Sequence, residues 1–284
     1  MSNLLEQKSR NRRHPILDLD AYSPEEVAGR VMQVGVKKVR LPGVITLMLG
    51  ILGGCFISLG ALYQVVVMAN PAISESASAV ASPLFYAMGY IIAFIAGAEI
   101  FTTNNLAVMS LASRKITFWE LTRNWTIVLL ANIAGAAGLV LLFFYSGQVD
   151  LFGGLLVEEV LFLTSSKLDY SLLQMFLLGL FGNLLICSGA WLAMAGRSVT
   201  DKFLALILSL SAVPAVGFQH ATGNMFHFFL SFLIIQDADA LQLPTDITLM
   251  KTSVSLVMVA AGNIVGGGVF IALTYYFIYV RSRW

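Results

Sequence analysis

The chain carries little charge, and this shortage excludes most classes of soluble protein. Only 12% of its 284 residues are Asp, Glu, Lys or Arg, which is about half the share of an ordinary soluble domain. Hydrophobic residues make up 58% of the sequence. The formal net charge of +1 gives no reason to expect a nucleic-acid partner. Lipid is therefore the expected surroundings of most of the chain.

Cysteine and histidine are scarce as well. Cys55 and Cys187 both fall inside apolar runs, where we expect free, buried thiols and no disulfide. No pattern of His and Cys has the spacing of a metal site, so we expect neither a metal nor a cofactor. The first forty residues are polar and basic, and they lack the short apolar core of a secretory signal.

Long apolar runs are the feature that is present. A helix needs roughly 20 apolar residues to cross the hydrocarbon core. Six runs meet this need, at residues 43–68, 84–112, 124–145, 171–195, 203–235 and 252–280. We therefore predict an all-α membrane protein with six transmembrane helices, contained in a channel domain over residues 41–284.

The positions of lysine and arginine predict the orientation. All but two of the 17 basic residues, Lys167 and Lys251, lie before the first run, after an even-numbered run, or at the end of the chain. Basic loops stay in the cytoplasm, so we expect both termini there. Residues 1–20 are expected to form a flexible cytoplasmic tail. In residues 21–40, Ser23-Pro24-Glu25-Glu26 is a helix start, and the helix lies either at the membrane interface or in the cytoplasm.

Two of the apolar runs are interrupted by polar residues and glycine. Residues 217–224 read Gly-Phe-Gln-His-Ala-Thr-Gly-Asn inside the fifth run, and residues 97–105 break the second run. Irregular backbone at this depth is tolerated where it lines a solute pathway. Each break starts a half-helix whose N–H groups favour an anion, and Thr102 and Thr222 add hydroxyl groups there.

Short phrases recur in the two halves of the chain. Residues 132–138 (Asn-Ile-Ala-Gly-Ala-Ala-Gly) match residues 263–268 (Asn-Ile-Val-Gly-Gly-Gly), and the two breaks occupy corresponding runs. Residues 41–147 and 167–280 are therefore expected to be copies of one unit of three spans. Three is an odd number of crossings, so the copies insert in opposite directions and form an inverted repeat of three plus three.

A few ionisable and amide side chains are the candidates for the chemistry. His220 is the imidazole of the second break, and a buried histidine can donate a hydrogen bond or a proton to an anion. Lys167 is either an ordinary surface lysine or attracts anions to the mouth of a pore. Asn183 and Asn263 either line the path or tie broken backbone together. Glu99 is expected to be structural, bonded to backbone N–H groups or protonated.

At these residues the chain resembles the formate–nitrite transporter family over roughly residues 20–283. The matching phrases are Gly97-Ala98-Glu99-Ile100-Phe101-Thr102, Arg123-Asn124-Trp125, Gly196-Arg197-Ser198 with Asp201-Lys202, His220 with Asn224-Met225-Phe226, and residues 262–268. The resemblance implies an aquaporin-like, six-span protomer in a homopentamer. It also implies passage of small monovalent anions such as formate or nitrite through a bacterial cytoplasmic membrane.

The resemblance also implies roles for individual residues. His220 is then the central proton donor, Thr102 lies in the central loop, and the polar surroundings are Lys167, Asn183 and Asn263. The family usually has Glu before this histidine, whereas this chain has Gln219. By register, the constriction is formed by Tyr86, Tyr90, Ile100, Phe101 and Val213, where the family has mostly Leu and Phe.

Other functions remain to be weighed against this one. A neutral-solute channel of the aquaporin kind would have paired Asn-Pro-Ala phrases and an intramembrane arginine, and the chain has neither. A hydrosulfide or acetate channel of the same family is a further alternative. A cation carrier would use Glu99. A membrane enzyme would need a nucleophile, a metal cluster or paired carboxylates, so we expect no enzymatic activity.

Overall fold

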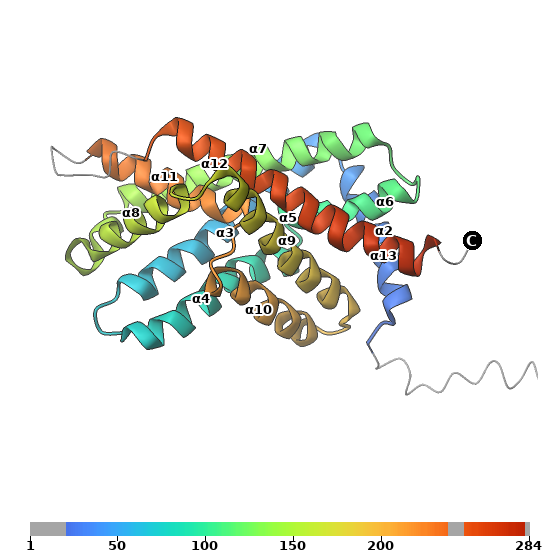
Figure 1. Ribbon diagram of the computed structural model, residues 1–284, viewed down its shortest axis with the longest axis horizontal. Coiled ribbons are helices and arrows are strands. Elements are labelled where there is room, and N and C mark those ends of the chain that lie inside the picture. Colours follow the sequence, from blue (N-terminus) through green and yellow to red (C-terminus); the bar gives the residue numbers. More distant parts are fainter. Residues whose placement is uncertain (1–20, 238–246, 282–284) are drawn as a thin grey trace, which may run out of the picture.

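The computed structural model describes residues 21–237 and 247–281, and within these ranges the chain is helical and contains no strand (Figure 1). The expected tail at residues 1–20 lies outside the described residues. The elements are α2 (Pro24–Val39), α3 (Gly43–Ala69), α4 (Glu75–Ala96), α5 (Phe101–Asn104), η2 (Asn105–Ala107), α6 (Val108–Ala112), α7 (Phe118–Tyr145), η3 (Gln148–Gly154), α8 (Leu155–Leu168), α9 (Leu172–Ala195), α10 (Val199–Ala215), α11 (Ala221–Asp237), α12 (Leu249–Asn263), η4 (Ile264–Leu273) and α13 (Thr274–Tyr279).

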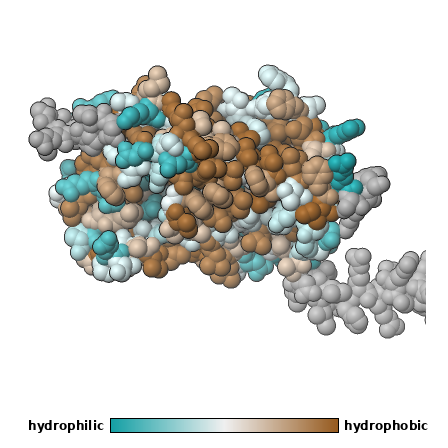
Figure 2. Space-filling model, viewed as in Figure 1, coloured by the Kyte–Doolittle hydropathy of each residue, from teal (hydrophilic) through white to brown (hydrophobic). Residues whose placement is uncertain are grey.

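Five continuous helices are long and apolar enough to cross a membrane, namely α3, α4, α7, α9 and the segment Leu249–Tyr279. The fifth expected span is divided into α10 and α11, which are 17 residues each. Large apolar side chains remain exposed on many of these helices, and Figure 2 shows them covering much of one face. An exposed apolar surface of this extent requires lipid or another subunit.

The second expected span differs from the observed helix at both ends. We placed its start at residue 84, directly after Pro83, but Ser74 caps α4 and Pro83 lies inside the helix. The helix ends at Ala96, and the chain continues after a break through α5, η2 and α6 as far as Ala112. The break itself covers only residues 97–100, because Thr102–Asn105 are already helical.

The two halves of the chain make matching hydrogen bonds at their breaks. The side chain of Asn132 in α7 accepts the N–H of Phe101 at 3.0 Å. The side chain of Asn263 in α12 accepts the N–H of Ala221 at 2.9 Å. Each asparagine thus caps the half-helix that follows the break in its own half. These matching bonds confirm the internal repeat.

Glycines let the broken segments lie directly against neighbouring helices. A side chain on Gly53 of α3 would collide with the carbonyl oxygen of Glu99, and one on Gly182 of α9 would collide with that of Gln219. Each carbonyl belongs to a break. The close approach of backbone to backbone is what small residues provide in membrane helices, and here it fixes the depth of both breaks.

The N-terminal helix α2 begins as the sequence predicts. Ser23 and Glu26 form a reciprocal capping box, and the buried face of α2 packs against η2, α6 and α9. The helix is therefore seated on the segment that follows the first break. Its position relative to a membrane surface stays a prediction.

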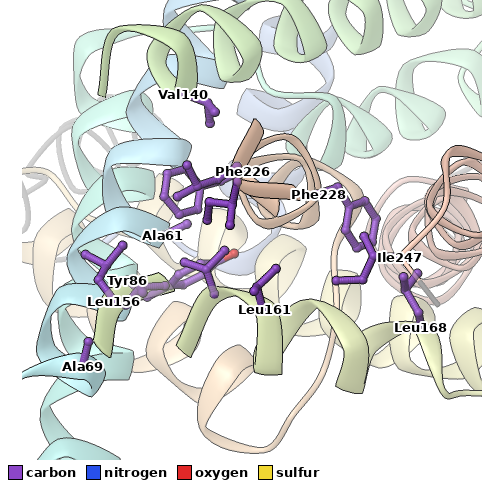
Figure 3. Packing of buried hydrophobic residues seen from close by; sticks show 14 residues of the cluster. Ala61, Ala69, Tyr86, Val140, Leu156, Leu161, Leu168, Phe226, Phe228 and Ile247 are labelled. Carbon is purple, nitrogen blue, oxygen red and sulfur yellow. The ribbon is translucent and has the colours of Figure 1, made fainter. Parts of the chain in front are cut away.

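One helix was not expected. The segment 146–170 contains α8, which packs against α3 and α11 through Leu156, Val160 and Leu161. In Figure 3 these contacts lie beside Tyr86 and Phe226. The last turn of α8 carries Lys167, so this helix decides where the lysine side chain lies.

Candidate functional site

The two breaks have the same backbone form. Gly97 and Gly217 adopt φ values of 81° and 77°, which side chains other than glycine rarely allow. The residue after each glycine bonds back to the helix it has left, from Ala98 N to Ala93 O at 2.8 Å and from Phe218 N to Val213 O at 2.9 Å. After each break the chain starts a new helix, at Phe101 and at Ala221, so the two expected breaks are confirmed.

The N–H groups at the half-helix starts already have protein partners. Those of Phe101 and Ala221 donate to the two asparagines described above, and that of Gly223 donates to Nδ1 of His220 at 3.0 Å. We had expected such N–H groups to be available to an anion. At these three positions they are not, so the donors offered to an anion must come from side chains.

The hydrogen bonds of His220 determine which of its nitrogens carries the proton. A backbone N–H can only donate, so Nδ1 of His220 must accept from Gly223. The proton of the neutral imidazole is then on Nε2, which bonds to the hydroxyl oxygen of Tyr86. Because that oxygen accepts from His220, the hydroxyl hydrogen of Tyr86 is left to donate elsewhere.

A second tyrosine lies on the other side of the imidazole. The hydroxyl of Tyr90 bonds to Oγ1 of Thr102 and lies 3.4 Å from Oγ1 of Thr222. Both tyrosine rings meet the imidazole edge to face, with centroids 5.6 Å away for Tyr86 and 5.2 Å for Tyr90. Residues from α4, α5 and the start of α11 therefore form one buried polar cluster around His220.

A cavity of about 150 Å³ reaches this cluster from the side of α8. We call it the Lys167 cavity. Lys167, Gln219, His220, Tyr86 and Val213 line it, and the sequence had singled out all five; the other lining residues include Gln64, Ser166, Tyr170, Asn224 and His227. Among the described residues, no carboxylate pairs with the Lys167 ammonium. The cavity wall is therefore positively charged.

Glu99 in the first half corresponds to Gln219 in the second half, and the two differ in their contact with lysine. Glu99 accepts from Nδ2 of Asn104 at 2.6 Å and lies 3.3 Å from the ammonium of Lys38 in α2. Its partners are thus an amide and a lysine, and the backbone partners that we expected are not found. Gln219 accepts from Nδ2 of Asn224 at 2.8 Å in the same manner. Lys38 is therefore paired with a carboxylate beside the first break, whereas Lys167 beside the second break has no such partner in the part of the chain that the structure describes.

Asn183 and Asn263 hold backbone in place and do not line the cavity. Nδ2 of Asn183 donates to the carbonyl oxygens of Thr102 at 3.2 Å and Asn263 at 2.7 Å. Nδ2 of Asn263 donates to Gly179 O at 2.7 Å. Both side chains are fully buried. Of our two interpretations, the structure favours the one in which they tie broken backbone together.

The five expected constriction residues are all buried, but they do not form one group. Tyr90, Ile100 and Val213 pack in a single apolar cluster next to the imidazole. Tyr86 packs with Ala61, Leu156 and Phe226 (Figure 3), and only its hydroxyl reaches His220. Phe101 belongs to a third cluster and lies edge to face with Trp125.

Several residues of the site were missed as site residues. Asn132 had been noticed only as part of a repeated phrase, although its match to Asn263 was the signal for a shared role. His227 follows His220 by seven residues, near the same helix face, and this spacing left open whether it packs in the core or lines the pathway. Lys38 gave no local signal, because its partner Glu99 is far away in the sequence.

Comparisons with known proteins agree with this geometry. The model of the family described as formate/nitrite transporter matches residues 25–277. The uncharacterized transporter YrhG of Bacillus subtilis (strain 168) is 32% identical over 262 residues, which cover 91% of this chain and 94% of that protein. The formate channel FocA of Escherichia coli (strain K12) is 29% identical over 276 residues, which cover 93% and 96%.

Solved structures are similar as well. A structure described as a pentameric formate channel with formate bound has a TM-score of 0.75 and 32% identity, and the match covers 84% of this chain and 98% of that one. An FNT family ion channel has a TM-score of 0.80 at 22% identity, with 89% and 98% covered, and so supports the fold. The fold and the site define an integral membrane channel or transporter for anions. The chain belongs to the formate/nitrite transporter family.

The family assignment confirms the resemblance seen in the sequence. It also decides between two of the alternatives, since an anion pathway is supported over a neutral-solute channel. The curated relatives named above are a channel and a transporter.

Proposed function

We propose that the protein conducts small monovalent anions of the formate and nitrite kind, as a homopentamer with one pore in each protomer. The observation that carries this proposal is the Lys167 cavity, a positively charged hollow that ends at the hydrogen-bonded pair Tyr86 and His220. One relative is named a formate channel, which supports the substrate. A similar solved structure is described as a pentameric formate channel with formate bound, which supports both the substrate and the assembly.

The proposal places the protein in the cytoplasmic membrane of a bacterium, with both termini in the cytoplasm. The distribution of lysine and arginine supports this orientation. The channel domain is then residues 41–284, with inverted repeats at 41–147 and 167–280 and with α2 as an interfacial helix. The Lys167 cavity faces the outside.

The first step of passage is electrostatic. The ammonium of Lys167, with which no carboxylate of residues 21–237 or 247–281 pairs, draws an anion into the cavity. At the floor of the cavity the anion meets the hydroxyl of Tyr86, whose hydrogen is available because its oxygen accepts from Nε2 of His220. His220 therefore acts on the anion through Tyr86, as the residue that directs the hydroxyl.

The second step must remove the charge of the anion. Beyond Tyr86 the path meets the apolar cluster that contains Ile100 and that packs with the cavity residue Val213, where a bare charge costs several kcal/mol. A proton that joins the anion removes this cost. With Nδ1 of His220 occupied by Gly223, the imidazole is neutral. We therefore propose that the proton comes from hydronium in the aqueous solution that fills the cavity, which becomes water as formate becomes formic acid.

Uptake by liposomes tests the function directly. Reconstituted protein is expected to take up formate and nitrite faster than empty liposomes do, with acetate and hydrosulfide as further arms that decide the substrate range. At constant total formate, the concentration of formic acid rises about tenfold for each unit of pH lost, and uptake should rise with it. Protein that conducts potassium but excludes both formate and nitrite contradicts the proposal, and uptake independent of pH contradicts the proton step.

Replacing Tyr86 with phenylalanine tests the donor at the cavity floor. A hydrogen bond to a charged group contributes about 1.5–3 kcal/mol, so Tyr86→Phe should slow formate uptake by about 10- to 100-fold. Tyr63→Phe is the matched control, because Tyr63 is exposed and its ring stacks on Phe85 at 5.6 Å. Equal uptake by the two variants would show that the Tyr86 hydroxyl does not contact the anion.

A further inference from the structure

We propose that the Lys167 cavity contains a resting site in which Gln219, His227 and Lys167 together bind a planar oxyanion before it reaches Tyr86. The site selects anions with two oxygen acceptors, such as carboxylates and nitrite. This inference rests on the proposed function, because it concerns the anion that the channel conducts. The side chain of His227 has no part in the passage described above.

Two buried side chains that line this cavity each have a nitrogen with no hydrogen-bond partner in the described part of the chain. Gln219 and His227 are each 2% exposed, and both line the cavity. Nε2 of Gln219 and Nδ1 of His227 have no hydrogen-bond partner among the described residues. A buried polar group left unpaired costs about 1–3 kcal/mol, and such groups in native proteins call for an explanation. An anion between them satisfies both.

The orientation of the Gln219 amide follows from its neighbour. Its Oε1 accepts from Nδ2 of Asn224 at 2.8 Å, so the N–H₂ group is the end that is left to bind an anion. At the equivalent position in the first half, Glu99 is a carboxylate that pairs with Lys38 at 3.3 Å. Glutamine in place of a carboxylate therefore changes the wall of the cavity from an acceptor that would neutralise Lys167 into a donor for an anion.

Helix packing brings Lys167 to the same place as His227. The hydroxyl of Thr164 in α8 donates to the carbonyl oxygen of His227 at 3.3 Å and lies 2.7 Å from the hydroxyl of Ser231. Lys167 follows Thr164 by three residues, so it lies one turn further along that face. On α11, Asn224 and His227 are likewise three residues apart, and both line the cavity.

The donors define the class of ligand. Lys167, Gln219 and His227 line a cavity of about 150 Å³. They can offer an ammonium, an amide N–H₂ and, in the tautomer with the proton on Nδ1, an imidazole N–H. A small planar oxyanion has one negative charge for the ammonium and two oxygens that can accept from the amide and the imidazole at once. Hydrosulfide offers both donors the same sulfur atom, which is a weaker hydrogen-bond acceptor than oxygen. The geometry therefore favours formate or nitrite over hydrosulfide in this site.

Two variants test the site through the concentration dependence of uptake. Gln219→Glu keeps the shape but replaces the donor with a carboxylate beside Lys167, and His227→Met removes the imidazole N–H at similar volume. In liposomes, each is expected to raise the half-saturating concentration of formate by about tenfold, the equivalent of one lost hydrogen bond to a charged group. For His227→Met, the maximal rate stays within about threefold, and the half-saturating concentration of hydrosulfide, if it is carried, does not change.

Lys251→Gln is the matched control for a lost or altered charge on the same side, because Lys251 is exposed at the start of α12 and does not line the cavity. A direct titration of the wild-type protein and His227→Met with ¹³C-formate, followed by NMR, should show weaker binding in the variant. Half-saturation that is unchanged in both variants, or that shifts as much in Lys251→Gln, overturns the resting site. Wild-type protein that carries no formate overturns the proposed function instead, so the two failures are distinguishable.

Discussion

Formate uptake is expected to fall by about 100-fold or more when His220 is replaced with phenylalanine. The imidazole is the partner of three groups, since Nδ1 accepts from the N–H of Gly223 and lies 2.9 Å from Oγ1 of Thr222, while Nε2 donates to Tyr86. Phenylalanine fills the volume but offers no polar atom. The Tyr86 hydroxyl is then free to turn away from the cavity, and the anion loses its directed donor.

The size of this effect follows from the cost of a charge at that depth. An anion without donors in the middle of a membrane is destabilised by several kcal/mol, and about 1.4 kcal/mol corresponds to a tenfold change in rate. The loss of about 3 kcal/mol therefore accounts for a factor of about 100. The effect should exceed that of Tyr86→Phe, because removal of the imidazole also leaves the buried N–H of Gly223 without its partner.

Uptake of formate into liposomes measures this prediction, and gel filtration of the variant shows whether it still assembles. His220→Asn is the informative companion, because asparagine retains one donor and one acceptor, and intermediate uptake is expected. Wild-type rates in a correctly assembled His220→Phe protein would remove His220 from the pathway altogether.

The parts of the site that the sequence predicted are those with local signals. A run such as Gly217-Phe218-Gln219-His220 inside an apolar segment can only be a break in the helix, because unpaired backbone and an imidazole are not tolerated in lipid. The match between Asn132 and Asn263 indicated two copies of one unit. Both signals depend on a few neighbouring residues, and the structure confirms both.

The parts that were not predicted depend on contacts between distant segments. Lys38 and Glu99 are 61 positions apart, and nothing near either residue indicates the pair. Likewise, α8 follows Gly154 without a side-chain cap, and Glu158 in its first turn is a weak start signal by itself. Without α8 in view, Lys167 could be assigned to a pore mouth but not to the cavity with His227.

Comparison of the two halves also shows what the substitution at Gln219 does. Both halves preserve a hydrogen bond in which an asparagine amide donates to the side chain five residues before it. Asn104 donates to Glu99, and Asn224 donates to Gln219. The repeat does not preserve the charge, because Glu99 and Lys38 neutralise each other on one side of the cluster, while on the other side Lys167 has no carboxylate partner in the described ranges. The electrostatic field across the pathway is therefore asymmetric, with the positive end at the cavity that we assign to the outside.

The largest loss of stability is expected from Asn263→Leu. The side chain of Asn263 is fully buried, accepts from the N–H of Ala221 at 2.9 Å and donates to Gly179 O at 2.7 Å and Gln219 O at 3.4 Å. Leucine leaves these three backbone groups without that partner. At about 1–3 kcal/mol for each buried unpaired group, the protein should lose at least about 3 kcal/mol, which is a fall of about 5–10 °C in the melting temperature.

The internal repeat supplies the companion and the control for this experiment. Asn132→Leu should be as damaging, because Asn132 bonds to Phe101 N at 3.0 Å and to Gly50 O at 2.7 Å in the equivalent positions. Asn70→Ala should change the melting temperature by no more than a degree or two, since its single bond to Ala72 N is exposed to solvent. Thermal unfolding of the three purified variants, followed by their elution on gel filtration, gives the comparison. If Asn263→Leu has the same melting temperature as Asn70→Ala, then the packing of glycine against backbone holds the break without the asparagine. In that case the two half-helices do not depend on these caps for their position.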